Sequence, residues 1–370
     1  MISKEPLKIL LVHLYANGDC LYATTVAKQI KMDYPNAKLT WAIADFCSAI
    51  IKNNPYVDEI LSLKNITKDH LGKFKKLKKD FLIQKEKGIW DEVFVTHNLD
   101  NQALYDGTIR GMVLNAYPHP ITVPIQPVLH LSGEEIQAAE NFAIANNLIA
   151  FKNVILWEFA PQSGQSVINL DKVLELSRRI SLIPSTCVIL TSGKKIPAIE
   201  NVFDASVLSI RENAALTHFC TLLIGSSSGI TWLTTSDAAK PLPMIQLFDQ
   251  DVAFLNAPSV DFKRFGIDNI KLIEITEVSD DLIHNCVKEV LETNFESAKL
   301  DYNQNIKLTF TTTRSIVYNL LCYVEIREVI KHFRVMTRLH GHNKRFLSTF
   351  FKAILGFPFR LIGNVVKKNI

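Results

Sequence analysis

Asp19 lies where a carboxylate can do chemistry, directly after Gly18 in a turn that follows the apolar run of residues 8–14. A carboxylate in such a turn can accept a proton as a general base, or it can cap the helix that begins there. The two roles do not exclude each other, because a carboxylate has two oxygens. The residues around Asp19 therefore leave both roles open.

A second loop with chemical capacity is Gly-Ser-Ser-Ser-Gly, residues 225–229, which joins an apolar stretch to a helix-like segment. Backbone N–H groups and hydroxyls at the start of a helix can surround a phosphate and use the positive end of the helix dipole. The loop thus predicts an anion site at Ser226, Ser227, Ser228 and Gly229. Because serine and glycine dominate turns of every kind, an ordinary strand-to-helix turn is the alternative.

The motifs of several familiar enzyme classes do not occur in the sequence. It has no G-x-x-x-x-G-K-[ST], no G-x-G-x-x-G after the first apolar run and no H-E-x-x-H. The six cysteines are scattered and form no C-x-x-C pair, which argues against a zinc site and a disulfide framework. Kinases, dehydrogenases and zinc proteases lose support, and a reducing, cytosolic setting fits best.

The composition and the charge distribution of the chain indicate how many domains it forms and where its charge lies. The 370 residues, 48% hydrophobic and 21% charged, are enough for two folded domains. Residues 314–370 hold 11 Lys and Arg against two acidic residues, a net of +9, so residues 1–313 sum to −5 of the total +4. No small-residue cleavage site follows the first apolar run, and we expect no signal peptide. The C-terminal segment is electrostatically distinct from the rest.

The elements that position these residues follow a parallel α/β rhythm, with short apolar runs alternating with helix-like segments. In the first half we expect strands over residues 7–14, 38–43, 57–61 and 92–97, and helices over residues 20–34, 46–54 and the lysine-dense stretch 64–87. In the second half we expect strands over 153–158, 186–191 and 221–224, and helices over 170–180 and 214–220. The pattern predicts two Rossmann-like domains, residues 1–148 and 149–310, and a tail over 311–370.

Several phrases of the first half occur in a distinctive order. After the Gly18-Asp19 turn come Tyr-Pro-Asn-Ala at residues 34–37, Leu-Thr-Trp at 39–41 and Asn-Pro-Tyr-Val-Asp-Glu at 54–59. In this order and spacing the chain resembles the family 9 glycosyltransferases, the ADP-heptose:lipopolysaccharide heptosyltransferases. A weaker likeness follows in residues 209–248, where a small-residue turn precedes a helix and Lys-Pro precedes an apolar strand.

The resemblance implies a GT-B fold, in which two facing Rossmann-like domains bind the acceptor and a nucleotide-sugar, respectively. It implies transfer with inversion, without a metal or a cofactor, and with Asp19 as the base. Asn17, Gly18, His97 and Arg110 are then candidates for the acceptor side. His97 and Arg110 can equally be loop or capping residues.

The donor side departs from the family pattern. The family's Asp-Thr-Gly turn is replaced by Ser227-Ser228-Gly229, and the loop of residues 161–168 holds no cation where the family has a lysine. Lys194 and Lys195, after the expected strand 186–191, can supply the missing charge; otherwise the backbone amides of residues 226–229 hold the diphosphate alone. Glu158, at the end of another strand, is a candidate for ribose or base contact.

The C-terminal segment interleaves phenylalanine, leucine and isoleucine with basic residues over 345–370. The apolar stretches are too short to span a bilayer, and we expect an amphipathic segment at an anionic membrane surface. Packing of this segment on the protein is the alternative. Residues 311–339 have helical spacing and are expected to cross back to the first domain. The lysines of residues 64–87 indicate a solvated helix face, or alternatively a contact with an anionic acceptor or lipid headgroups.

Together these features predict an inverting glycosyltransferase that transfers a heptose or related sugar from a nucleotide-sugar to lipopolysaccharide or another surface glycan. The expected location is the cytoplasmic face of a bacterial inner membrane, with no nucleic-acid partner. Two rivals remain: a non-catalytic, membrane-associated GT-B scaffold that has lost its diphosphate clamp, and a GT-B sugar-nucleotide epimerase.

Overall fold

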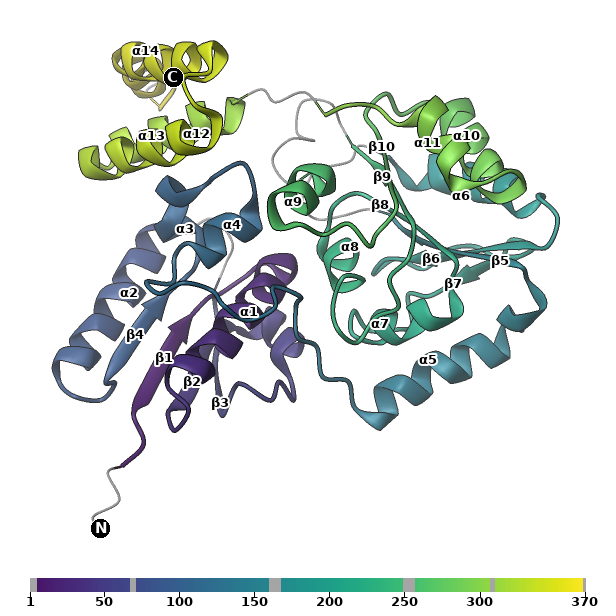
Figure 1. Ribbon diagram of the computed structural model, residues 1–370, viewed down its shortest axis with the longest axis horizontal. Helices are drawn as coiled ribbons and strands as arrows, with labels where there is room; N and C mark the ends of the chain where they lie inside the picture. The colour runs from purple at the N-terminus through teal and green to yellow at the C-terminus, as the bar shows by residue number, and fades with distance from the viewer. Residues whose placement is uncertain (1–4, 67–70, 160–167, 249–256, 307–309, 369–370) are drawn as a thin grey trace.

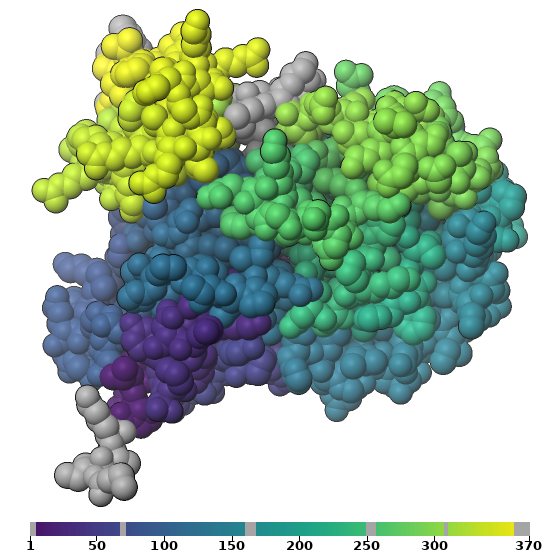
Figure 2. All heavy atoms as spheres, viewed as in Figure 1, coloured from purple at the N-terminus to yellow at the C-terminus, as the bar shows by residue number. Residues whose placement is uncertain are grey.

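The computed structural model describes residues 5–66, 71–159, 168–248, 257–306 and 310–368. Within them, two parallel sheets form the centres of two halves, and helices cover both sheets (Figure 1). A third group of helices, at the C-terminal end of the chain, forms a cap on the first half (Figures 1 and 2).

The first half is built on a four-stranded parallel sheet in the order β3-β2-β1-β4. Four of the five residues of β1 are buried, because helices cover both faces of this central strand, and its sequence is a continuous apolar run. The chain moves outward from β1 to β3 and then returns to the other side of β1 as β4. Its elements are β1 (Lys8–Val12), α1 (Asn17–Asp33), β2 (Lys38–Ala44), the 3-10 helix η1 (Asp45–Ile51), β3 (Glu59–Leu63), α2 (Leu71–Glu86) and β4 (Glu92–Val95).

The second half is built on a six-stranded parallel sheet in the order β10-β9-β8-β5-β6-β7. Here too the chain moves outward from the central strand β5 to β7 and returns to its other side as β8. The strands are β5 (Asn153–Glu158), β6 (Thr186–Thr191), β7 (Val202–Asp204), β8 (Leu222–Gly225), β9 (Met244–Leu247) and β10 (Leu272–Ile275). The helices are α6 (Leu170–Ser181), α7 (Glu212–Leu216), α8 (Gly229–Leu233), α9 (Pro258–Phe265), α10 (Asp280–Glu292) and α11 (Phe295–Tyr302), with the 3-10 helix η4 (Thr217–Phe219) after α7.

Short helices connect the halves: α3 (Asn98–Asn101), η2 (Gln102–Leu104), α4 (Ile109–Leu114), α5 (Gly133–Ala145) and η3 (Leu148–Ala150). A capping box starts α5, in which the Ser132 hydroxyl accepts from the Glu135 backbone and the Glu135 carboxylate accepts from the Ser132 backbone. Although α5 precedes residue 148 in the chain, it packs against α7 of the second half. The domain boundary at residues 148 and 149 stays a prediction.

A buried ion pair joins the two halves. The Arg110 Nε atom in α4 lies 3.0 Å from an Asp261 carboxylate oxygen in α9, and both side chains are at most 1% exposed. The Arg110 guanidinium also donates to the Ile125 carbonyl and lies 4.6 Å from the centre of the Tyr22 ring. Tyr22 packs in turn against Trp232 of α8, with 5.2 Å between ring centres. This pair therefore anchors α1 and α4 to the second half.

A second buried arginine makes an independent joint. Arg211 donates to both carboxylate oxygens of Glu135, at 2.6 and 2.8 Å, and to the carbonyls of Ala49 and Lys52 at the end of η1. The apolar core between these joints is continuous, because residues of both sheets belong to one buried cluster. The two halves thus share a core and do not meet only through a linker.

The C-terminal cap consists of α12 (Thr311–Cys322), α13 (Ile326–His340) and α14 (Lys344–Lys368). Its side chains form one buried cluster with Ala103, Tyr105 and Met112 of the first half. The expectation of one helix over 311–339 is wrong, because the chain turns at Val324, which has a left-handed φ of 58°. Phe346 and Phe350 of α14 are buried in this cluster, so for these two residues packing on the protein replaces the expected membrane contact.

The Arg110–Asp261 pair carries a testable stability prediction. Replacing one partner leaves the other charge buried without compensation, so we expect Arg110→Met to lower the free energy of unfolding by about 3–5 kcal/mol. Urea denaturation followed by tryptophan fluorescence measures this difference. The matched control is Arg178→Met, which breaks the exposed Arg178–Glu175 pair and should cost less than about 1 kcal/mol. A loss in Arg110→Met as small as in the control would contradict the role of this joint.

Candidate active site

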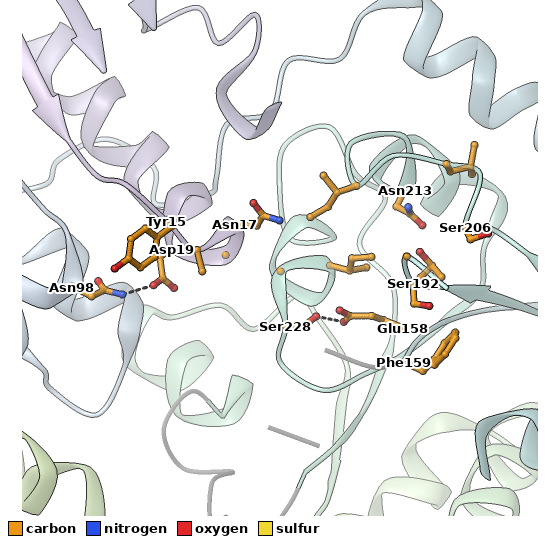
Figure 3. A pocket seen from close by; sticks show the side chains of 18 of the residues that line it. Tyr15, Asn17, Asp19, Asn98, Glu158, Phe159, Ser192, Ser206, Asn213 and Ser228 are labelled. Atoms are coloured by element: carbon orange, nitrogen blue, oxygen red, sulfur yellow. Dashed lines mark hydrogen bonds between the residues drawn. The ribbon is translucent and has the colours of Figure 1, made fainter. Parts of the chain in front are cut away.

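Each sheet reverses its strand order at one point, between β1 and β4 in the first half and between β5 and β8 in the second. In open parallel sheets, a crevice for ligands opens beyond the carboxyl ends of the strands at such a reversal. Asp19 in the first turn of α1 and Asn98 at the start of α3 come soon after β1 and β4, Glu158 is the last residue of β5, and Ser228 lies in the loop after β8. All four residues line one cavity of about 550 Å³ between the halves (Figure 3).

The halves approach each other closely beside this cavity. A Cβ atom on Gly18 of α1 would lie 3.2 Å from the Trp232 ring of α8, and a Cβ on Gly229 would lie 3.3 Å from the Cβ of Asn17. Glycine at both positions lets the starts of α1 and α8 come this near without displacing these neighbours. The two glycines therefore bring the Asp19 turn and the serine loop to the same wall of the cavity.

Asp19 is in the first turn of α1 and points into the cavity (Figure 3). Ala16 is the N-cap residue, and the Asp19 carboxylate accepts hydrogen bonds from the Ala16 backbone and from the Asn98 side chain. Burial raises the pKa of Asp19 to about 7, against the lowering effect of these two bonds. The carboxylate thus makes a capping-type contact and is poised to gain or lose a proton near neutral pH.

Glu158 is the second carboxylate of the cavity and belongs to the other half. It ends β5, is buried, and accepts a hydrogen bond from the Ser228 hydroxyl (Figure 3). Burial raises the pKa of Glu158 to about 7, and the Ser228 bond opposes that rise. A second titratable group therefore faces the cavity from the side expected to hold the donor.

The serine loop is less open to a phosphate than its sequence indicates. Ser228 and Gly229 line the cavity, whereas Ser226 and Ser227 are buried and do not. The Ser227 backbone N–H donates to Gln246 at 2.7 Å and is not available to a ligand. The helix that follows, α8, has only five residues, so its dipole contributes little. Ser228 is the serine of this loop that lines the cavity, and its hydroxyl donates to the Glu158 carboxylate.

The expected cations do not line the cavity. Lys194 and Lys195 are exposed just beyond Ser192 and Gly193, which do line it. Arg110 is committed to Asp261 and Ile125, so its guanidinium serves the joint between the halves. Among the described residues that line the cavity there is no lysine and no arginine. The loop of residues 161–168, expected on the donor side, lies outside the described residues except for Ile168.

His97 lines the cavity from the loop after β4 and is 1% exposed. Its ring packs against Tyr15 and Phe74, with 4.6 and 4.8 Å between ring centres. Burial, and secondarily the neighbouring His13, lower the pKa of His97 well below its usual value. The imidazole is therefore neutral at pH 7 and can both donate and accept a hydrogen bond.

Two residues that sequence reasoning missed also face the cavity. Asn98 follows His97 and holds Asp19, and Asn213 lies at the start of α7. Asn98 could have been predicted as His97 was, because ligands bind beyond the carboxyl ends of parallel strands and both residues follow such a strand. Asn213 follows no strand and reaches the cavity only through the packing of α7, so no local pattern marks it. No group of three or more His, Cys, Asp or Glu among the described residues could hold a metal ion.

We compared the sequence and the structure of this chain with those of known proteins. No protein-family model matches the sequence, and no curated protein matches it. A glycosyl transferase family 9 structure from Veillonella parvula is 13% identical, covers 80% of this chain and 99% of that chain, and has a TM-score of 0.54. E. coli ADP-heptose lps heptosyltransferase II is 13% identical, with 78% and 100% covered and a TM-score of 0.52.

The chain has the GT-B fold. This confirms the predicted fold class, with two Rossmann-like halves and added C-terminal helices. A putative UDP-N-acetylglucosamine 2-epimerase from Listeria monocytogenes is also similar, at 10% identity over 87% of this chain and 98% of that chain, with a TM-score of 0.49. At these identities the likeness concerns the fold, and the activity has to be argued from the cavity.

The raised pKa of Glu158 predicts how stability depends on pH. The folded protein holds the Glu158 proton up to about pH 7 and the unfolded chain only to about pH 4.5, so stability falls as pH rises between these values. Glu158→Gln has no charge to bury and still accepts a hydrogen bond from Ser228. We expect its free energy of unfolding to match wild type near pH 4 and to exceed it by about 3 kcal/mol near pH 8.

Urea denaturation at the two pH values measures this difference. The control Glu86→Gln changes an exposed residue of α2 and should differ from wild type by less than about 0.5 kcal/mol at both pH values. If Glu158→Gln were no more stable than wild type near pH 8, Glu158 would not carry a buried charge in the folded protein.

Proposed function

We propose that the protein is a glycosyltransferase of the family 9 type, which transfers a sugar from a nucleotide-sugar to a hydroxyl of a surface glycan with inversion. The observation that carries this proposal is the cavity in which the strand reversals of both GT-B halves meet, with Asp19 pointing into it (Figure 3). Lipopolysaccharide as acceptor and ADP-heptose as donor are the finer form of the proposal and rest on the sequence resemblance.

Asp19 acts as the base in this scheme. It removes the proton of the acceptor hydroxyl while the oxygen attacks the anomeric carbon from the face opposite the nucleotide. The new carbon–oxygen bond forms as the bond to the diphosphate breaks, and the nucleoside diphosphate leaves with that electron pair. A carboxylate with a pKa of about 7 suits the task, because it is partly ionised at neutral pH yet binds a proton well.

The donor is proposed to bind on the second half, with its diphosphate near the Ser228 hydroxyl and its ribose or base near Glu158. Lys194 and Lys195 lie next to the lining residues Ser192 and Gly193 and are the nearest candidates along the chain for a charge contact. Acceptor contacts are proposed for Asn17, Gly18 and His97, which line the cavity on the first half. Arg110 would influence the acceptor only through the position of α4.

A non-catalytic GT-B scaffold is the second candidate. The observation that favours it is the lining of the cavity, which among the described residues contains no cation to hold a diphosphate. Asp19 favours the enzyme, because a scaffold has no need of a half-buried carboxylate with a pKa of about 7.

Asp19→Asn separates the two candidates. Asparagine can still accept the Ala16 hydrogen bond and support the helix start, but it cannot take up a proton. We expect nucleoside diphosphate release, from a mixture of ADP-, UDP- and GDP-sugars with bacterial glycolipid extract, to fall by about 10²–10⁴-fold. The control Asp171→Asn, in the first turn of α6 and away from the cavity, should release as much as wild type. Unchanged release in Asp19→Asn would exclude Asp19 as the base.

Attachment to an anionic membrane surface is part of the proposal. Within the described residues, none of the helices has the length and apolarity needed to cross a bilayer. The C-terminal cap does expose apolar side chains beside basic ones: Phe351 and Leu355 on α14 are 53% and 72% exposed, and Phe351 packs against Phe333 of α13. The neighbouring exposed face of α13 carries a row of basic side chains, Arg327, Lys331, Arg334 and Arg338. This surface would rest on the lipid headgroups at the cytoplasmic face of the inner membrane.

Vesicle co-sedimentation tests the attachment. Wild type should sediment with phosphatidylcholine vesicles that contain phosphatidylglycerol and should be released by high salt. The double variant Phe351→Ser with Leu355→Ser should bind at least about tenfold more weakly, because burial of each side chain contributes about 1.5–3 kcal/mol.

The matched control is Ile144→Ser with Ile149→Ser, which removes two exposed apolar side chains, 75% and 95% exposed, from the region of α5 and η3. It should sediment as wild type does. Equal binding of the α14 variant and wild type would show that α14 does not face the lipid.

A further inference from the structure

Ser228 and Glu158 form a hydrogen-bonded pair in the half of the cavity proposed for the donor (Figure 3). Glu158 ends β5 and Ser228 follows β8, and these two strands are neighbours in the second sheet. Both side chains line the cavity and are only 6% exposed. The Ser228 hydroxyl donates to the Oε2 atom of Glu158. A diphosphate bound near Ser228 therefore also meets the carboxyl group of Glu158.

The number of hydrogens on this pair determines what it can offer to a phosphate. When Glu158 is ionised, the pair has one hydrogen, that of the Ser228 hydroxyl, and it lies between the two side chains. Only lone pairs and a negative charge then face the cavity, and they repel a diphosphate. When Glu158 is protonated, the pair is neutral and has a second hydrogen, which it can donate to a phosphate oxygen.

The rest of the described lining offers no charge that would bind a diphosphate in place of this proton. The ionisable side chains that line the cavity with Glu158 are Tyr15, Asp19 and His97, all from the first half. His97 is neutral at pH 7, because burial lowers its pKa. The strands paired with β5, and the loops after them, bring only uncharged described side chains to the lining. Burial raises the pKa of Glu158 to about 7, so its proton is available near neutral pH.

We infer that the donor diphosphate binds to the Ser228–Glu158 pair together with one proton, so that a neutral carboxylic acid replaces a cation as hydrogen donor to the phosphate. The inference deepens the proposed function and rests on it for the nucleotide-sugar. The phosphate in turn retains the proton, because a nearby negative charge favours the neutral form of a carboxyl group. The Glu158 oxygens keep lone pairs for a ribose hydroxyl, so the proposed ribose contact is compatible with this role.

The same proton assists the departure of the nucleotide. As the bond between the anomeric carbon and the phosphate oxygen breaks, its electron pair moves onto that oxygen, and the hydrogen bond from the neutral pair to the diphosphate strengthens. Asp19 takes the proton of the acceptor hydroxyl and later loses it to water. Transfer thus needs Asp19 ionised and Glu158 protonated in the same molecule, and its rate should peak near pH 7 and fall on both sides.

Glu158→Gln is the matched variant. Glutamine is neutral at every pH, accepts the Ser228 hydrogen bond through its oxygen and donates through its amide nitrogen, so it copies the protonated form of Glu158. Asp19→Asn is the second variant, because Asp19 also titrates near pH 7 in this cavity and could affect binding of an anion. Glu86→Gln changes an exposed residue of α2 and serves as the control.

Calorimetric titration of the full chain measures donor binding without turnover, with ADP-, UDP- and GDP-sugars offered separately and no acceptor. Nucleotide-sugars are the suitable probes, because both phosphates are diesters of constant charge, whereas the terminal phosphate of a free nucleoside diphosphate titrates near about pH 6. We expect wild type to bind one nucleotide class about 30-fold more weakly at pH 8.5 than at pH 6, since a carboxyl group with a pKa of about 7 is protonated in only about 3% of molecules at pH 8.5.

Titrations at pH 7.5 in buffers of different ionisation enthalpy count the protons directly. Wild type should take up about 0.7 proton per bound donor, because roughly that fraction of a group with a pKa of about 7 is ionised beforehand. Glu158→Gln should take up none and should bind equally well at pH 6 and pH 8.5. Asp19→Asn and Glu86→Gln should show the pH dependence of wild type.

Three results would each overturn the inference: donor affinity of wild type that is equal at both pH values, a pH dependence that persists in Glu158→Gln, or one that disappears in Asp19→Asn. All three leave the proposed function standing, because the nucleotide-sugar still binds. Absence of binding at every pH would refute the nucleotide-sugar site and the inference with it. Proton-linked binding without transfer to any acceptor would sustain the inference and refute the enzyme.

Discussion

Two buried arginines join the halves of this protein, and the cavity lies between the halves that they join. Arg110 ties α4 to Asp261 of α9, and Arg211 ties the second half to Glu135 and to the carbonyls that end η1. A guanidinium buried in this way is unfavourable unless its partners stay in place, so the halves cannot shift without breaking a costly contact. The apolar core runs between these joints without a break. The carboxyl ends of β1 and β4 therefore face those of β5 and β8 across a narrow space.

Burial in this space raises the pKa values of its two carboxylates. Asp19 and Glu158 come from different halves, and burial raises the pKa of each to about 7. A carboxylate in open solvent is fully ionised at neutral pH and is a weak base. Burial thus turns an ordinary carboxylate into a useful proton acceptor. The amide oxygens of Asn98 and Asn213 in the same cavity have no hydrogen-bond partner within the described structure.

The sequence predicted those site residues that lie next to a recognisable strand, and it missed those that only tertiary packing brings to the site. Asp19, His97 and Glu158 were found because they follow apolar runs that read as buried strands, and the strand-end rule for parallel sheets is local. Asn213 and Arg211 were missed, because α7 reaches the cavity and the joint only through tertiary packing. Arg110 was expected at the acceptor, because its partner Asp261 lies 151 residues away and nothing local indicates a buried pair.

The same distinction explains the C-terminal cap. Its mixture of aromatic and basic residues is equally suited to a protein core and to a lipid surface, and periodicity cannot tell which face meets which partner. The structure buries Phe346 and Phe350 in the cluster that the cap helices share with the first half and leaves Phe351 and Leu355 exposed. The break between α12 and α13 at Val324 was also invisible, because a left-handed valine is rare and has no sequence signal.

The central claim is that the two halves form a nucleotide-sugar site, and thermal shift tests it most directly. A ligand that binds only the folded protein raises its apparent melting temperature in proportion to the logarithm of its concentration. With ADP-, UDP-, GDP- and CMP-sugars offered separately, we predict that one nucleotide class raises the melting temperature and that Asp19→Asn responds equally, because the base does not hold the nucleotide. A melting temperature unmoved by every nucleotide-sugar would contradict the claim.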